Sequence, residues 1–153
     1  MRYWLFKSEP TCFSFNDLQS RPGAVEHWDG VRNFQARNFL RDEIKIGDRL
    51  LFYHSSIPEP AVVGLCTVVQ AGYPDHTALD PSSDHFDPRS TPDNPIWYMV
   101  DVRADQAIVP PVTLAAIRSN PLLADMPLLH RSRLSIQPLT EEQFFTIMQM
   151  GGL

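Results

Sequence analysis

The sequence predicts one α+β domain over residues 1–153, built on a small mixed or antiparallel sheet that curls into a barrel with helices at its edges. The length of 153 residues is that of a single domain. A content of 43% hydrophobic and 20% charged residues is typical of a globular protein. The strand-like segments are not separated by regular helices, which disfavours a doubly wound parallel sheet.

Five segments have the apolar, aromatic or β-branched composition of strands. They are residues 3–6, 49–54, 61–69, 96–102 and 134–137. Segment 49–54 is almost entirely apolar, so we expect it to be buried on both faces. Segment 134–137 alternates apolar and polar residues, so we expect it to be half exposed.

Four helices are expected where a capping residue or a helical spacing of apolar residues occurs. They run from Ser14 to Gln19, from Val31 or Asn33 to Asp42, from Thr113 to Arg118, and from Thr140 to the pair Gly151-Gly152. In the second helix Arg37 and Arg41 are one turn apart, so their side chains should lie on the same face.

Residues 73–95 should form a long loop, because they contain five prolines, which lack the N–H that a strand donates. Residues 75–93 hold five acidic residues and one arginine, which accounts for −4 of the formal net charge of −5. This charge argues against indiscriminate coating of nucleic acid but not against a pocket for one base. The acidic and histidine residues of the loop lack metal-binding spacing, so we expect no metal and no cofactor.

Several classes of protein are disfavoured by missing features. No stretch approaches the roughly 18 apolar residues of a membrane span, and no signal peptide is recognised, so we expect a cytoplasmic protein with no membrane partner. The motifs of a nucleophile elbow, a phosphate-binding loop and a dinucleotide fold are absent, so no catalytic residue is predicted. We expect Cys12 and Cys66 to be buried small hydrophobic residues.

Polar residues follow two of the predicted strands. Ser8-Glu9-Pro10 ends the first strand, and Tyr53-His54-Ser55-Ser56 ends the second. If these strands are neighbours, both polar groups share one rim, where Glu9 could accept a hydrogen bond from an exocyclic amine. Solvated turns are the alternative interpretation.

Two further positions in the sequence could contact a ligand. Trp28 lies in a polar loop ahead of a helix, where a tryptophan either fills the core or stacks on a planar ligand; the residues alone favour core filling. Arg131-Ser132-Arg133 precedes a predicted strand and could contact a phosphate or a base edge.

Three motifs together resemble the EVE domain family. They are YWLFKSEP at residues 3–10, WDGVRNFQARNFLR at residues 28–41 and FYHS at residues 52–55. The resemblance extends through nearly the whole chain and implies a PUA-like fold, similar to that of YTH domains. It also implies a partly aromatic pocket for a modified nucleobase, with modified cytosine in DNA as the favoured ligand, and it shifts the interpretation of Trp28 towards stacking.

Carried onto this sequence, the resemblance implies a base-binding pocket formed by Lys7, Ser8, Glu9, Trp28, Asn33, Tyr53, His54, Ser55, Arg133, Leu134 and Ser135. Candidate phosphate contacts are Arg32, Arg37 and Arg41, together with Arg133.

Three hypotheses follow. The first is a non-enzymatic protein that binds a nucleic acid carrying a modified base, DNA or alternatively RNA, with the base flipped out or single-stranded. The second is an enzyme acting on a modified base or nucleotide, with Glu9 or His54 as acid or base. The third is a pocket for a free modified nucleoside.

Overall fold

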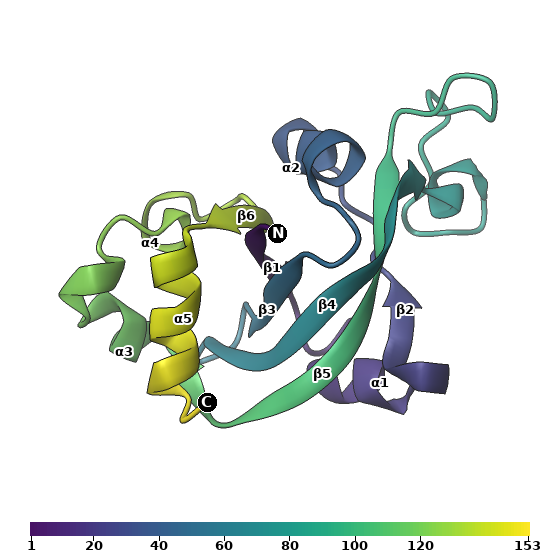
Figure 1. The fold of residues 1–153 in the computed structure, drawn as a ribbon. Helices are drawn as coiled ribbons and strands as arrows, with labels where there is room; N and C mark the ends of the chain where they lie inside the picture. The colour runs from purple at the N-terminus through teal and green to yellow at the C-terminus, as the bar shows by residue number, and fades with distance from the viewer.

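Six strands form one mixed sheet in the order β2-β5-β4-β3-β1-β6 (Figure 1). The structure, a computed structural model, describes all residues from 1 to 153. The strands are β1 (Tyr3–Ser8), β2 (Val25–His27), β3 (Arg49–His54), β4 (Ala61–Pro74), β5 (Tyr98–Thr113) and β6 (Ile136–Leu139). The edge strands β2 and β6 are not paired with each other, so the sheet curls without closing into a barrel.

Five α-helices accompany the sheet: α1 (Phe15–Ser20), α2 (Phe34–Asn38), α3 (Leu114–Arg118), α4 (Pro127–His130) and α5 (Glu141–Met150). Helix α2 continues into a π-helical turn, Phe39–Glu43. Short 3-10 turns lie at Pro22–Ala24, His76–Leu79 and Pro121–Leu123. No helix is long and apolar enough to span a membrane.

The central strands β1 and β3 are parallel, with Tyr3 paired to Arg49 and Ser8 paired to His54, whereas every other pairing is antiparallel. Residues 50–53 of β3 are buried, as expected for a strand covered on both faces. The predicted α+β class with a curled mixed sheet is confirmed.

Each face of this strand pair carries its own hydrophobic core, because successive side chains in a strand point to opposite faces. Trp4 and Phe6 pack in one cluster with residues of α1 and α2. Leu5 and Leu51 pack in the other with residues of α3, α4 and α5. Figure 1 shows α3, α4 and α5 together on one side of the sheet. Because the two cores lie on opposite faces of β1 and β3, the ends of these strands border both cores.

Local signals placed the helix starts correctly. Ser14, Asn33, Thr113 and Thr140 each cap a helix with their side chains, and Thr140 forms a capping box with Gln143. Strand β4 approaches α1 closely at Gly64, where a Cβ atom would overlap the Phe15 ring.

Several predicted elements differ in the structure. Strand β5 runs to Thr113, well beyond the predicted end at residue 102, and β2 and α4 were not predicted at all. The half-exposed strand at 134–137 is wrong: β6 begins at Ile136, and Gln137 is fully buried. The buried Gln137 side chain is satisfied only at its amide nitrogen, which donates to the carbonyl oxygens of Leu134 and Arg131 at 2.9 and 3.1 Å, whereas its Oε1 has no hydrogen-bond partner.

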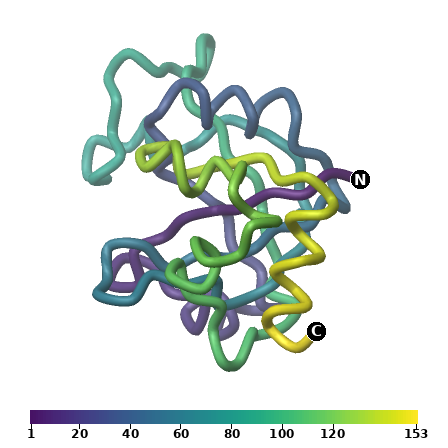
Figure 2. Tube along the Cα trace, turned by 90° about the vertical axis from the view of Figure 1, so that its left-hand side faces the viewer, coloured from purple at the N-terminus to yellow at the C-terminus, as the bar shows by residue number.

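The acidic loop between β4 and β5 projects from the body of the protein (Figure 2), and two buried carboxylates tie it to that body. The Asp87 carboxylate accepts a 2.7 Å hydrogen bond from Trp97 Nε1, which lies at the end of the loop. The Asp75 carboxylate accepts from Gly30 N at 2.9 Å, from an Arg32 guanidinium nitrogen at 3.1 Å and from Thr77 N at 2.9 Å. Asp75 therefore joins the loop to the segment that follows β2.

Protonation of Asp75 should weaken the fold. Burial alone would raise the pKa of Asp75, but hydrogen bonds from Thr77, Gly30 and Arg32 hold it below its ordinary value. The ionised form is thus favoured by folding, so its contribution is present above pH about 4 and is lost as the pH falls through the folded-state pKa. We expect Asp75→Asn to lower the free energy of unfolding by about 2 kcal/mol at pH 7.

Urea unfolding followed by circular dichroism from pH 7 to pH 3 would measure this effect. The difference between wild type and Asp75→Asn should shrink below pH about 4. Asp84→Asn is the matched control, because Asp84 is an exposed acid of the same loop. A difference that stays constant down to pH 3 would contradict the role of the ionised carboxylate.

Candidate base-binding pocket

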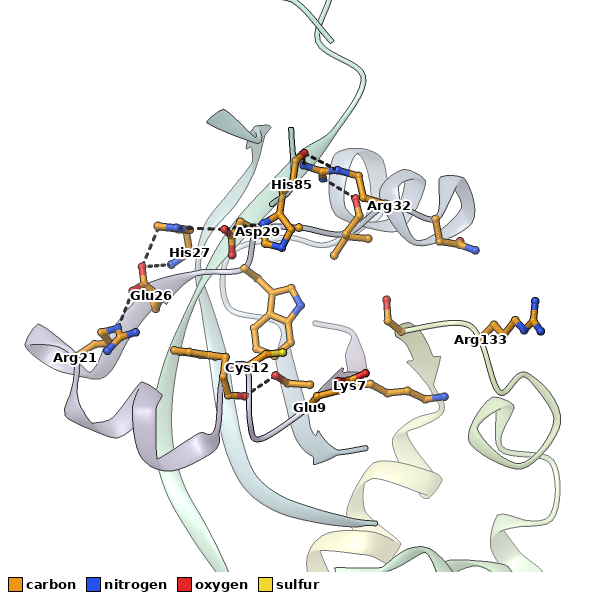
Figure 3. Close-up of a pocket in the computed structure, with 17 residues that line it drawn as sticks. Lys7, Glu9, Cys12, Arg21, Glu26, His27, Asp29, Arg32, His85 and Arg133 are labelled. Carbon is orange, nitrogen blue, oxygen red and sulfur yellow. Dashed lines mark hydrogen bonds and ion pairs between the residues drawn. The ribbon is translucent and has the colours of Figure 1, made fainter. Parts of the chain in front are cut away.

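A cavity of about 660 Å³ opens beside the end of β1 (Figure 3). The residues that line it come from the end of β1 and the turn after it, from the C-cap of α1, from β2 and the segment between β2 and α2, from the acidic loop and from the approach to β6. They are Lys7, Ser8, Glu9, Cys12, Phe13, Arg21, Glu26, His27, Trp28, Asp29, Gly30, Val31, Arg32, Asn33, His85, Arg133 and Ser135. The volume lies within the usual range of small-molecule sites.

Trp28 belongs both to the core and to the cavity lining. Its ring meets Phe6, Phe52 and Phe13 edge to face, with centroid distances of 5.1, 5.2 and 6.3 Å. Its backbone N–H donates to Val100 O at 2.7 Å, and the residue is only 8% exposed. Trp28 thus fills the core, as its sequence context favoured, while part of its surface faces the cavity.

Gly30 shapes the rim of the cavity next to Trp28. It has a φ of +77°, a conformation that favours glycine, and an added Cβ would lie 2.5 Å from the His85 ring. Arg32 holds the same rim, because its guanidinium donates to the carbonyl oxygens of Val31 and His85 as well as to Asp75. Arg32 lines the cavity, but its guanidinium is already engaged by the protein.

One side of the cavity carries paired acidic and basic groups. Glu26 accepts from Arg21 Nε at 2.8 Å and lies 2.9 Å from His27 Nδ1. Asp29 lies 3.9 Å from His27 Nε2 and 3.4 Å from His85 Nδ1. Burial would raise the pKa of Glu26, but Arg21 and His27 hold it below its ordinary value. The acids on this side therefore have partners within the protein.

The opposite side carries the less engaged cations Lys7 and Arg133, as Figure 3 shows. Lys7 Nζ donates to Ser132 O at 3.0 Å, and burial lowers the Lys7 pKa. Arg133 is exposed and has no acidic partner in the structure. This side is suited to an anion such as a phosphate.

Several polar groups remain available between these two sides. Asn33 uses its side-chain oxygen to accept from Ala36 N at 2.9 Å, which leaves its amide NH2 without a protein partner. Glu9 is exposed, and its carboxylate has one contact, with the Ser56 hydroxyl at 3.4 Å. The Ser8 hydroxyl, by contrast, donates to Phe13 O. The cavity thus offers both a donor and an acceptor to a ligand.

Seven of the eleven predicted base-pocket residues line this cavity: Lys7, Ser8, Glu9, Trp28, Asn33, Arg133 and Ser135. The other four do not. Tyr53 and Ser55 line a second cavity on the other side of β1. His54 accepts a hydrogen bond from Phe15 N at 3.1 Å on its Nε2, and Leu134 is buried in the core.

The predicted phosphate contacts Arg37 and Arg41 also lie outside the cavity. Arg37 donates to Ile96 O at 2.7 Å, and Arg41 forms a 2.9 Å ion pair with Asp42. Both arginines lie away from the core, but each guanidinium is already bound by another group of the protein.

Nine lining residues were not predicted from the sequence: Cys12, Phe13, Arg21, Glu26, His27, Asp29, Gly30, Val31 and His85. Glu26, His27 and Asp29 flank Trp28 in the chain, so their proximity was a usable signal. Cys12 is exposed, contrary to expectation, whereas Cys66 is buried. No cluster of three or more His, Cys, Asp or Glu side chains in the chain is arranged to hold a metal ion.

Comparison with known proteins gives relatives that match nearly the whole chain. Human thymocyte nuclear protein 1 is 42% identical over 165 residues, which cover 97% of this chain and 73% of the human protein. The crystal structure of human THYN1 protein in complex with 5-methylcytosine-containing DNA has a TM-score of 0.94 at 40% identity, covering 100% of this chain and 99% of that one. A hypothetical protein from Leishmania major has the same TM-score at 42% identity, covering 99% and 95%.

The EVE domain family matches residues 2–150. The motifs around Lys7, Trp28 and Tyr53 lie within this match. The relatives are similar to this chain in both sequence and fold over nearly its full length. The chain therefore belongs to the EVE domain family.

Proposed function

We propose that this protein binds a modified nucleobase, most favourably a modified cytosine in DNA, in the cavity around Trp28, and that it does so without catalysis. The observation that carries the proposal is that a relative with the same fold, human THYN1 protein, forms a complex with 5-methylcytosine-containing DNA. The two chains are 40% identical over the whole of this chain, so we infer a shared class of ligand from sequence and fold together.

The composition of the cavity supports a planar, polar ligand. Trp28 and Phe13 supply aromatic surface, and stacking of a base on an aromatic side chain contributes roughly 1–3 kcal/mol. Glu9 can accept a hydrogen bond from the exocyclic amine of cytosine, and the free Asn33 amide can donate to a ring or carbonyl acceptor.

The base must leave its stack before it can enter such a cavity, so the DNA is flipped locally or single-stranded. Lys7 and Arg133 then lie where they can contact the backbone, which positions the strand without reading its sequence. Their side of the cavity has no acid except Glu9, so an approaching phosphate meets little repulsion.

The enzyme hypothesis has less support in the geometry. Of its two acid/base candidates, His54 lies outside the cavity and uses its Nε2 to hold the first turn of α1. Glu9 has no titratable group within hydrogen-bond distance with which acid and base roles could be divided, because its one contact is the Ser56 hydroxyl at 3.4 Å.

The first test is a binding panel of short DNA and RNA oligonucleotides with cytosine or 5-methylcytosine, measured by fluorescence polarisation at two salt concentrations. We expect 5-methylcytosine DNA to bind at least about fourfold more tightly than unmodified DNA, since one buried methyl contributes about 0.8 kcal/mol. Affinity should fall steeply as salt rises, because phosphate contacts release counterions.

Equal affinity for modified and unmodified oligonucleotides would overturn the proposal. Salt-independent binding of the free nucleoside alone would instead support a nucleoside pocket, and tighter binding of the RNA would change the polymer. Mass spectrometry of the recovered oligonucleotide tests for catalysis, because a changed base would identify an enzyme.

A second test concerns Glu9. We expect Glu9→Ala to weaken binding of 5-methylcytosine DNA by about tenfold, since a base-edge hydrogen bond contributes roughly 1–3 kcal/mol. Glu59→Ala is the matched control: Glu59 is also exposed and acidic, but it lines neither cavity. Isothermal titration calorimetry gives both affinities, and equal losses in the two variants would show that only the net charge matters.

A further inference from the structure

A second cavity, of about 300 Å³, lies on the opposite face of β1 and β3 from Trp28. Its walls include Leu114 of α3 and Leu128 of α4, together with Ser132. The charged residues that line it are Lys7 and Arg118, and no acidic residue contributes to it. The cavity is therefore a cationic recess with partly apolar walls.

Tyr53 places an unused hydroxyl group in this cavity. The residue as a whole is only 3% exposed, but it lines the cavity, and its hydroxyl forms no hydrogen bond with any other group of the protein. Burial raises the Tyr53 pKa, so the hydroxyl stays protonated and is able to donate. A hydroxyl without a protein partner at a cavity wall is available to donate to a ligand.

Arg118 is the second unused group. It is exposed on the last turn of α3, and its guanidinium has neither an ion pair nor a hydrogen bond within the protein. Arginine without a carboxylate partner, next to lysine and a hydroxyl donor, is a typical arrangement for phosphate.

The two cavities meet at Lys7. Lys7 lines both, and it is the register partner of Tyr53 on the neighbouring parallel strand. Lys7 Nζ also donates to the carbonyl of Ser132, which lines the second cavity, while the next residue, Arg133, lines the first. A chain leaving the first cavity over the end of β1 thus passes directly to the second.

We infer that the second cavity is a nucleotide subsite that holds the phosphate and sugar of the nucleotide next to the modified base on the same strand. Arg118 and Lys7 would bind the phosphate, the Tyr53 hydroxyl would donate to one of its oxygens, and Leu128 would pack against the sugar. This inference rests on the proposed function. It also gives Tyr53 and Ser55 a backbone-positioning role in place of the base contact that the family resemblance implied.

The test compares three small ligands by isothermal titration calorimetry: 5-methyldeoxycytidine, and the two dinucleotides that add one thymidine on its 5′ or its 3′ side. We expect one of the two dinucleotides to bind wild type at least about tenfold more tightly than the nucleoside. Arg118→Ala should abolish most of that gain, and Tyr53→Phe should reduce it by about threefold, whereas nucleoside affinity stays unchanged.

Arg103→Ala is the control for lost positive charge, because Arg103 is exposed on β5 and lines neither cavity. Thermal unfolding of each variant checks that the fold is intact. With a longer oligonucleotide, Arg118→Ala should also lower the salt dependence by one phosphate contact, whereas Arg103→Ala should not.

The possible failures are distinguishable. If wild type binds none of the modified ligands, including longer oligonucleotides, the proposed function fails. If wild type binds them and Arg118→Ala and Tyr53→Phe retain the full dinucleotide gain, the function stands and the subsite is wrong. A loss that is equal for the nucleoside and the dinucleotides would also overturn the subsite, because it would indicate damage to the first cavity.

Discussion

The arrangement of this protein depends on one constraint: β1 and β3 are paired in parallel in the interior of the sheet and are buried on both faces. Such a pair needs cover on each side, so α1 and α2 pack over Trp4 and Phe6, while α3, α4 and α5 pack over Leu5 and Leu51. Because the strands are parallel, their polar ends lie at one edge. A cavity can therefore form on either face of that edge, and Lys7 is common to both cavities.

Most charges near the first cavity already have partners, which determines what that cavity can bind. Arg32 is held by Asp75 and Arg21 by Glu26, so neither guanidinium is free for a ligand. The less engaged groups are Lys7, Arg133, Glu9 and the Asn33 amide. A ligand with a neutral polar edge and an anionic backbone is complementary to this set, whereas a small highly charged anion would use only part of it.

Features set by neighbouring residues were predictable from the sequence, and features set by distant contacts were not. The caps at Ser14, Asn33 and Thr140 depend on side chains and amides three residues apart, so the local pattern sufficed. Strand β2 is three residues long and exists because it pairs with β5 across the sheet. Among the site residues, Tyr53, His54 and Ser55 were correctly placed at a strand end, but which cavity each one faces depends on strand pairing.

The acidic loop is fastened by Asp75 at one end and by Asp87 and Trp97 at the other, while His85, between them, covers Gly30 at the cavity rim. The structure of the sheet therefore does not depend on the identity of the residues between these two anchors. Substitutions there can therefore change the shape and charge of the cavity rim without loss of the scaffold. Under the proposed function, one short stretch of chain can thus adjust the ligand preference of the cavity while the sheet keeps its structure.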